Sequence, residues 1–261
     1  MKKVWIVYLF FMFTCLSSVY AAGGITHMYL SQEAVKQLPD PTLRELLLEN
    51  FDAYLVGSYY PDSGYISGTT HGEVSHWDPF IDAFAKYIKD TYPNPIKSNP
   101  RLIAFLFGCA SHRVADEIIH RTFYPIVAEH DFKNDRNQAH GHGDAGIDLL
   151  LNLDRNLWTL APLRWWVPVH DLLAIYERMK EPGITAHQIK WGNAALMIAG
   201  FTERLIALPS YPYLKLRMPW TAKHYFLHPV GGLEMITKKI SLYQMDLWHQ
   251  FKDTSLVKHP P

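Results

Sequence analysis

Three residues of metal-binding type recur at four-residue intervals in the middle of the chain: His112, Asp116 and His120. An α-helix has 3.6 residues per turn, so residues four apart lie along one slowly drifting stripe. Two imidazoles and a carboxylate can therefore point into the same space. A single His-x-x-x-Asp pair is common on an exposed helix surface, but burying three polar groups in an apolar helix without partners is costly. The triplet therefore favours a metal site.

A second His-x-x-x-Asp pair follows at His140 and Asp144, in a glycine-rich segment that leads into the apolar run Leu149-Leu150-Leu151. Imidazole and carboxylate ligands without cysteine are typical of a hydrolytic zinc site that keeps one coordination position open for water, and manganese and iron use similar ligands. Two such sites a few ångströms apart would hold a bridging hydroxide and clamp a phosphoryl group. We therefore expect a metal-assisted hydrolase.

One helix offers too few ligands for several ions, so further ligands must come from other parts of the chain. His27, Asp62 and His76 are the upstream candidates. Three other histidines, by contrast, are expected at the surface or outside the ligand shell: His71, His130 and His142.

The first 21 residues have the pattern of a secretory signal peptide. Met1-Lys2-Lys3 is basic, residues 4–13 are apolar, and Ala21 fits the end of a cleavage site. The apolar run is shorter than the roughly 20 residues that a membrane-spanning helix needs, so a membrane anchor is less favoured. We expect cleavage after Ala21, a catalytic domain over residues 22–261, and a secreted or periplasmic location.

Cleavage would leave a free α-amino group on Ala22, close in sequence to His27. Its reference pKa is roughly 8, so a cation can deprotonate it at low cost and use it as a ligand. Cleavage would also leave Cys109 as the sole cysteine, which excludes an internal disulfide. Its apolar neighbours predict a buried, inert thiol.

The composition fits a globular enzyme. Hydrophobic residues make up 48% of the chain, which is ample for a packed core. Lys+Arg and Asp+Glu both number 25, so no net charge attracts nucleic acid or an anionic membrane. The 14 histidines are compatible with metal binding, but only their positions can decide it.

Helical periodicity dominates the sequence, and the alternation typical of strands is almost absent. We predict helices over 31–38, 41–54, 79–90, 102–124, 144–153, 169–180, 185–208 and 233–251. Loops are predicted over 57–72, which is rich in Gly, Ser and Tyr, and over 129–136. Pro125 is expected to end the central helix, while Pro209, Pro212 and Pro219 mark a break. The predicted architecture is an all-α, single-domain helical bundle.

Three motifs give the sequence a resemblance to a known family: LIAFLFGCASHRVADEIIH (102–120), AHGHGDAGIDLLL (139–151) and WWVPVHDLLAIYERM (165–179). They resemble the zinc-dependent phospholipase C family, and most closely its branch of glycosylphosphatidylinositol-specific phospholipases D. That family also resembles the fungal zinc-dependent single-strand nucleases. The resemblance runs from about residue 23 to about residue 208 and is less distinct over the last 50 residues or so.

The resemblance implies an all-α fold with three zinc ions at the bottom of a cleft, with Asp116 shared by two of them. Carried over residue by residue, it implies three ligand groups: Asp62, His76, His112 and Asp116; His120, His140 and Asp144; and His27, Asp116 and the amine and carbonyl of Ala22. The loop before His76 is shorter than in the phospholipase D branch, which leaves His71 as an alternative. Trp77-Asp78-Pro79-Phe80 resembles the family's continuation and favours His76.

We therefore expect an exported zinc-dependent phosphodiesterase that hydrolyses phospholipid head groups, in which a metal-bridging hydroxide attacks phosphorus and Asp62 assists as general base. C-type cleavage is favoured, with D-type cleavage of glycosylphosphatidylinositol next. The substrate would lie at a membrane or micelle surface; a nucleic acid is less favoured, and no obligate protein partner is evident. The competing hypotheses are a single-strand nuclease and a metal- or lipid-binding protein without turnover. Four aromatic residues are candidates for the cleft mouth: Tyr59, Tyr60, Tyr65 and Trp77.

Overall fold

The computed structural model describes residues 23–157 and 166–252. Every regular element in these two ranges is a helix, which confirms the predicted all-α fold. The elements are α2 (Gly24–Gln37), α3 (Pro41–Glu49), α4 (Phe51–Tyr59), η1 (Tyr60–Asp62), α5 (Ser63–Ser67), α6 (His71–Ser75), α7 (Asp78–Thr91), α8 (Pro95–Ser98), α9 (Pro100–Ile118), η2 (Ile119–Phe123), α10 (Tyr124–Asp131), α11 (Arg136–Asp154), α12 (Val169–Arg178), α13 (Ala186–Arg217), α14 (Thr221–His224) and α15 (Leu233–Lys252). The predicted signal peptide and Ala22 lie outside the described residues.

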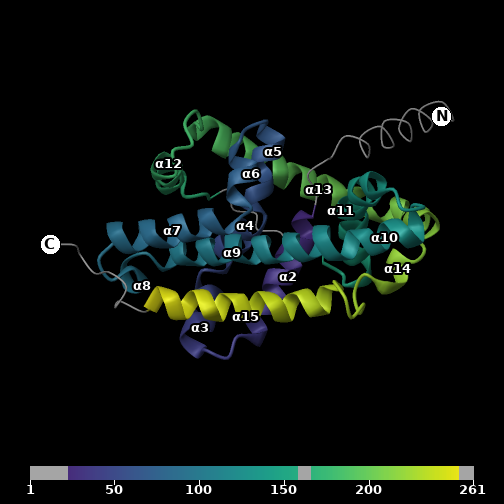
Figure 1. Ribbon diagram of the computed structural model, residues 1–261, viewed down its shortest axis with the longest axis horizontal. Helices are drawn as coiled ribbons and strands as arrows, with labels where there is room; N and C mark the ends of the chain where they lie inside the picture. Colours follow the sequence, from purple (N-terminus) through teal and green to yellow (C-terminus); the bar gives the residue numbers. More distant parts are fainter. Residues whose placement is uncertain (1–22, 158–165, 253–261) are drawn as a thin grey trace.

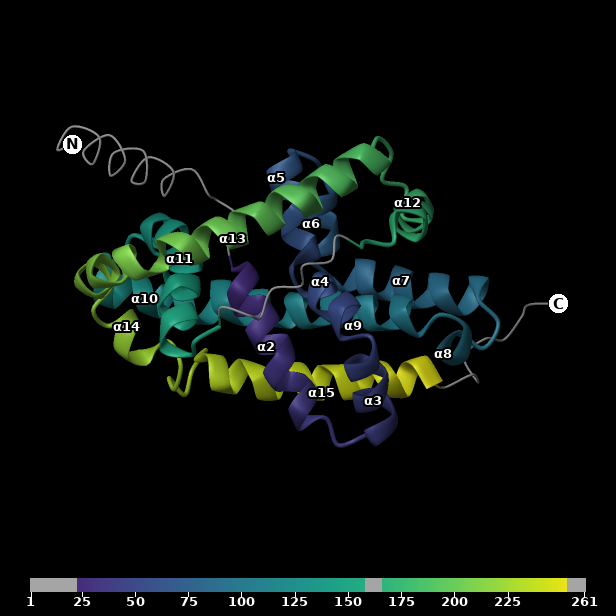
Figure 2. The ribbon, with the colours of Figure 1, turned by 180° about the vertical axis from the view of Figure 1, so that it is seen from behind.

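Helix α9 is the central element of the fold, lying along the long axis with α7 beside it (Figure 1). Both views place α15 and α3 on one side of α9 and α13 on the opposite side (Figures 1 and 2). Helices α2 and α4 also pack on α9. The segments that carry the predicted ligands meet beside the C-terminal half of α9, where His112 and Asp116 lie.

Two glycines allow α4 and α9 to pack backbone against backbone. A Cβ on Gly57 would lie 2.2 Å from the carbonyl oxygen of Phe105, and one on Gly108 would lie 2.2 Å from that of Tyr54. No side chain fits at such distances, so glycine is required at this contact. The close approach brings the end of α4 within hydrogen-bonding reach of His112.

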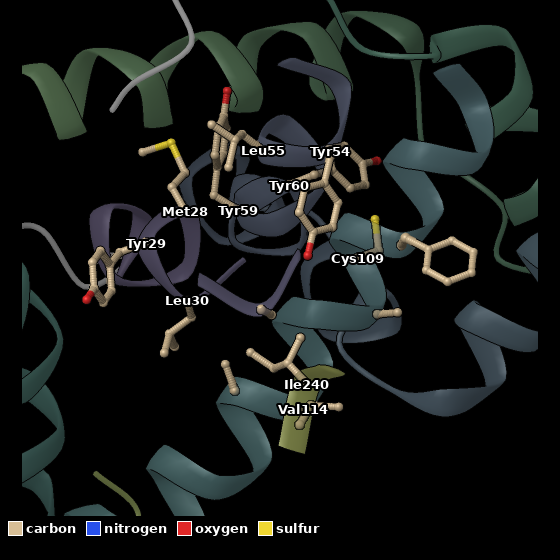
Figure 3. Packing of buried hydrophobic residues seen from close by; sticks show 14 of the residues in the cluster. Met28, Tyr29, Leu30, Tyr54, Leu55, Tyr59, Tyr60, Cys109, Val114 and Ile240 are labelled. Atoms are coloured by element: carbon tan, nitrogen blue, oxygen red, sulfur yellow. The ribbon is translucent and has the colours of Figure 1, made fainter. Parts of the chain in front are cut away.

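The hydrophobic core lies where α2, α4, α9 and α15 meet. The buried cluster includes Met28 of α2, Tyr54 of α4, Tyr60 of η1, Cys109 of α9 and Ile240 of α15 (Figure 3). Burying each large apolar side chain contributes roughly 1.5–3 kcal/mol. Burial also raises the pKa of the Cys109 thiol well above its usual value, as expected for the inert cysteine that the sequence predicts.

The predicted loop over 57–72 is wrong, because short helices fill most of it. Helix α4 continues to Tyr59, and η1, α5 and α6 follow with few residues between them. A Cβ on Gly64 would lie 2.0 Å from the backbone nitrogen of Gly72. These glycines permit tight packing between short helices rather than a flexible loop.

Pro125 does not end the central helix, contrary to the prediction. After α9 the chain forms the wide π-turn η2 and continues as α10, with Pro125 in the first turn of α10. A proline in a regular helix removes one backbone hydrogen bond and clashes with the preceding turn. The wider π-turn relieves that clash, and such turns are frequent at functional sites. His120 lies inside this turn.

Several other predicted boundaries are also corrected. The expected helix over 41–54 is two helices that meet at Asn50. Helix α11 begins at Arg136, so the glycine-rich segment is helical and the predicted loop 129–136 shrinks to about four residues. Helix α13 continues through Pro209 and Pro212 to Arg217. None of the described helices is both long enough and apolar enough to span a bilayer.

Candidate metal centre

His112 is the most buried of the predicted ligands. Its Nδ1 donates a hydrogen bond to the backbone carbonyl of Ser58 at 2.9 Å, which the glycine contact between α4 and α9 makes possible. This bond leaves Nε2 as the lone-pair nitrogen, 3.8 Å from a carboxylate oxygen of Asp62 and 3.7 Å from one of Asp116. Nε2 is buried and has no hydrogen-bond partner within the protein. An imidazole fixed through one nitrogen and bare at the other is typical of a metal ligand.

His76 is oriented in the same way from the opposite side. Its Nδ1 donates to the backbone carbonyl of Gly72 at 2.5 Å. Its Nε2 lies 3.2 Å from Oδ1 of Asp62 and 3.4 Å from Oδ2 of Asp116. The short turns η1, α5 and α6 therefore bring Asp62 and His76 together and place both against α9.

Asp116 stands at the centre of the predicted ligand set. Its Oδ1 is 3.3 Å from Nε2 of His27 and 3.2 Å from Nε2 of His120, while its Oδ2 faces His76 and His112. The ring of His27 stacks on that of His112 with centroids 3.9 Å apart. One carboxylate thus faces four imidazoles from separate parts of the chain, the position that a shared ligand would occupy.

The second group is built by the π-turn and by α11. The rings of His120 and His140 lie 4.6 Å apart, and Asp144 lies one helical turn beyond His140. The hydroxyl of Tyr124 donates a hydrogen bond to Asp144 and fixes that carboxylate. This group lies nearer the solvent than the first, because His140 is exposed.

The described residues form three groups whose ligand atoms lie within 4.8 Å of one another: Asp62, His76 and His112; His27, His112 and Asp116; and His120, His140 and Asp144. His112 belongs to two groups, but Ser58 occupies its Nδ1, so only Nε2 is left for one ion. An ion beside His27 and Asp116 therefore needs a further ligand. All eight predicted side-chain ligands in the described residues belong to these groups.

The carboxylates of Asp62 and Asp116 are held ionised. Burial alone would raise the pKa of Asp116, but His112 and His120 outweigh it and hold the pKa well below its usual range. Burial likewise opposes ionisation of Asp62, yet His112 and His76 lower its pKa. Both groups are thus ready to accept a cation.

Without a metal, the site holds protons instead. Burial opposes charge on His76 and His120, but Asp62 beside His76 and Asp116 beside both raise the pKa of each imidazole to about 9. Desolvation raises the pKa of Asp144 to about 8, although His120 acts to lower that pKa. Part of the Asp144 side chain nevertheless lines the cleft. The cluster therefore gathers positive charge around its carboxylates.

The residues present fit zinc. They offer imidazole nitrogens and carboxylate oxygens without thiols, the usual donors of hydrolytic zinc sites. Burying this many ionisable groups is costly without a cation to pair them. Nε2 of His112 faces the two carboxylates and is buried without a hydrogen-bond partner, which is an unsatisfied position that a metal ion would fill.

Asp148 organises the first turn of α2. Its buried carboxylate accepts the backbone N–H groups of Ile25 at 2.9 Å and Thr26 at 2.8 Å, and also the hydroxyl of Thr26. These bonds satisfy orphan donors at the helix start and place His27 beside Asp116. A Cβ on Gly23 would lie 3.2 Å from the His27 ring, so the chain enters α2 alongside that imidazole.

Sequence reasoning did not single out Tyr124 or Asp148. Both continue the four-residue spacing of the predicted ligands, Tyr124 after His120 and Asp148 after Asp144. That spacing was the available signal. Their partners, however, lie on other elements and follow only from the packing.

A cavity of about 510 Å³ opens over the cluster. Tyr65 and Trp77 line it, as predicted for the mouth, together with Arg121, whose guanidinium lies 5.5 Å from the Trp77 ring centre. Tyr59 and Tyr60 do not line it, because both side chains are buried in the core.

His71, the alternative to His76, lies apart from the ligand groups. It is fully buried rather than at the surface, with its two ring nitrogens bonded to Ser63 and Thr69. Burial lowers its pKa to about 4, so it is neutral. The geometry therefore places His76, and not His71, in the cluster.

A sequence profile described as zinc dependent phospholipase C matches residues 26–191. This match covers more than half of the chain, so the chain belongs to the zinc-dependent phospholipase C family, as the resemblance of its motifs implies. The matched range includes every predicted ligand from His27 to Asp144. Family membership places the chain among hydrolytic enzymes of the phospholipase type.

Several curated relatives carry the name phosphatidylinositol-glycan-specific phospholipase D. The Homo sapiens protein is 35% identical over 229 residues, which cover 81% of this chain and 27% of the relative. The Mus musculus protein is 36% identical over 82% of this chain and 27% of its own length, and the Dictyostelium discoideum protein is 29% identical over 84% and 24%. The chain thus spans about a quarter of the relatives that it matches. No solved structure matches the chain significantly.

Proposed function

We propose that the chain is an exported phosphodiesterase that hydrolyses phospholipid head groups at a site for three zinc ions. The observation that carries this proposal is the buried, bare Nε2 of His112, held between the carboxylates of Asp62 and Asp116. The family description and the names of the relatives support zinc dependence and a phospholipid substrate.

The geometry of the ligand groups would assign the ligands to three ions. One ion would use Asp62, His76 and His112, with Asp116 alongside. A second would use His120, His140 and Asp144. The third would bind His27 and Asp116, completed by the amine and carbonyl of Ala22, because the side chains alone provide too few donors.

Zinc ions at such a site lower the pKa of a water nucleophile and neutralise charge that develops on the phosphoryl oxygens. The protein's own groups do the rest. Asp62 is ionised and borders the cavity, so it can accept a proton from the attacking water. Arg121 and the rings of Tyr65 and Trp77 line the mouth, where a head group with its phosphate would enter.

The ligands do not decide which ester bond breaks. The family description favours C-type cleavage on the glycerol side of phosphorus, which releases diacylglycerol and a phosphorylated head group. D-type cleavage of glycosylphosphatidylinositol is the second candidate, and the printed name of the relatives favours it. D-type cleavage would release phosphatidic acid instead.

Phosphorus-31 NMR of the products distinguishes these functions. The mature chain is incubated with choline and inositol phospholipids, with glycosylphosphatidylinositol and, separately, with single-stranded DNA, each with and without a chelator. We expect phosphorylated head groups from phospholipid and no reaction with chelator present. Phosphatidic acid would support the D-type candidate. Hydrolysis of DNA alone, or of none of the substrates by zinc-loaded protein, would overturn the proposal.

A further inference from the structure

Helix α13 exposes an apolar surface that no described element covers. We call it the α13 apolar face, and its large exposed residues are Trp191, Ile198, Phe201, Leu205, Leu208 and Leu216. At 100° per residue these positions lie within about 100° of arc, so they form one side of the helix. From Trp191 to Leu216 the face is about 37 Å long, at 1.5 Å per residue. Monomeric soluble proteins rarely expose an apolar strip of this extent.

The charges of α13 are distributed as on a helix that rests on a lipid surface. The sole carboxylate among residues 186–217 is Glu203, which is buried. The exposed cations Lys190 and Lys215 stand at the two ends of the face. The hydroxyl of Thr202 donates a hydrogen bond to the backbone carbonyl of Ile198 at 2.9 Å, so its donor is satisfied within the helix. Lysines can reach phosphate groups while the apolar residues enter the acyl boundary.

Helix α15 shows what an ordinary solvent-facing helix of this protein looks like. Its exposed positions carry mostly charged or polar residues: Glu234, Lys238, Lys239, Leu242, Asp246, His249, Gln250 and Lys252. Leu242 is the sole large apolar residue among them, and it is 61% exposed. The α13 apolar face therefore departs from the pattern of a helix on the opposite side of the same molecule (Figure 2).

The packing of α13 links this face to the cleft. A Cβ on Gly192 would lie 2.2 Å from the carbonyl oxygen of Ser63, so α13 presses directly on α5, which carries Tyr65. At its other end, Arg217 donates to Gln138 at 2.5 Å on α11, which carries His140 and Asp144. Figures 1 and 2 both show α13 alongside α5 and α11. Helix α13 thus contacts two of the helices that line the metal site.

We propose that the α13 apolar face docks on the surface of a phospholipid bilayer. This inference rests on the proposed function, because a lipid substrate lies in such a surface and the enzyme must hold itself there. Exposed leucine and phenylalanine would enter the acyl boundary, while Lys190 and Lys215 contact lipid phosphates. The lysines at its ends and the lack of exposed carboxylates on α13 itself favour this occupant over a second copy of the chain.

The test compares two matched double variants of the mature, zinc-loaded chain. Leu205→Gln/Leu208→Gln alters the α13 apolar face, and the control Leu48→Gln/Leu242→Gln alters exposed leucines on α3 and α15, on the other side of the molecule. Flotation measures binding to phosphatidylcholine vesicles with and without anionic lipid. We expect the α13 variant to bind at least ~10-fold more weakly, and the control to bind like the parent. Hydrolysis of a short-chain, monomeric phospholipid should be equal in all three proteins.

Each contrary result has a definite meaning. Equal vesicle binding by the parent and the α13 variant would overturn the docking proposal. The parent protein could instead sediment as a dimer and fail to bind vesicles, while the α13 variant sediments as a monomer. That result would assign the face to a second copy of the chain. Vesicle binding requires no turnover, so normal docking without hydrolysis would contradict only the proposed function. Hydrolysis of the monomeric lipid with unaltered vesicle binding would contradict only the docking proposal.

Discussion

At the scale of the residue, the site depends on imidazoles that the backbone fixes in one orientation. His112 and His76 each donate through Nδ1 to a backbone carbonyl and turn Nε2 toward the carboxylates. Such outer hydrogen bonds fix the tautomer and raise the basicity of the ligand nitrogen. The positions of Ser58 and Gly72 are therefore as much part of the site as the ligands are.

Removing the His112 imidazole tests this arrangement. We expect His112→Ala to lose at least one zinc ion per chain and to lower phospholipid hydrolysis by at least ~100-fold, because no nearby group can replace Nε2. Metal analysis and initial rates measure both effects. His249→Ala, at an exposed position on α15, is the matched control and should keep both. Unchanged hydrolysis by the His112 variant would remove the site from the proposed mechanism.

The raised pKa values predict how zinc binding depends on pH. In the metal-free protein His76 and His120 have a pKa of about 9, above the usual 6.5, and Asp144 has a pKa of about 8. Zinc must displace these protons. We therefore expect zinc affinity to rise between pH 6 and about 9, and binding at pH 7 to release protons, which calorimetry in buffers of different ionisation enthalpy measures.

The stability of the metal-free protein should change with pH in the opposite direction to its zinc affinity. In the metal-free protein, the imidazoles of His76 and His120 have a pKa that is raised in the folded state. Their protonation stabilises the fold fully below pH 6.5, and this contribution is lost as the pH rises through 9. Thermal unfolding in chelator should follow that trend, with lower stability at pH 9 than at pH 6. A zinc affinity that does not change with pH would contradict the assignment of these groups as ligands.

At the scale of the element, helix periodicity explains what the sequence could predict. The four-residue spacing predicted that His112, Asp116 and His120 would share one face, and these side chains do converge. The π-turn at His120 could not be predicted from the pattern. It accommodates Pro125 where the chain continues from α9 into α10, and that continuation depends on the packing of the fold. Likewise, the glycines near Gly64 indicate loops by composition but provide close contacts in the fold.

The glycine contact between α4 and α9 should be sensitive to one methyl group. Gly108→Ala would bring a Cβ within 2.2 Å of the Tyr54 carbonyl oxygen, so one helix must move. We expect a loss of roughly 1–3 kcal/mol in the free energy of unfolding, measured by denaturant titration, and weaker zinc binding, because Ser58 would shift from His112. Gly200→Ala on α13 meets no atom within 4 Å and should be neutral or slightly stabilising. Equal stability of the Gly108 variant would show that the contact is not tight.

At the scale of the whole molecule, the fold places the first described residues beside the predicted ligand cluster. Asp148 fixes the first turn of α2, and Gly23 lies beside the His27 ring, where the third ion is proposed. In the proposed function, export and catalysis are linked, since cleavage after Ala21 would create the amine of Ala22.

A chain with extra residues before Ala22 tests this link. We expect it to bind one zinc ion fewer and to hydrolyse phospholipid more slowly, because its terminal amine cannot reach the site. Proteolytic removal of the extra residues should restore both, which controls for misfolding. Full zinc content and activity in the extended chain would eliminate the terminal ligand while leaving the other two ligand groups as proposed.

The number of zinc ions per chain is the most direct test of the metal centre. Mature protein that begins at Ala22 should contain three zinc ions by plasma mass spectrometry, lose them together with its hydrolytic activity in a chelator, and regain both on addition of zinc. A count of one or two would contradict the three-ion site. Protein that hydrolyses phospholipid without zinc or any other metal would contradict the whole account.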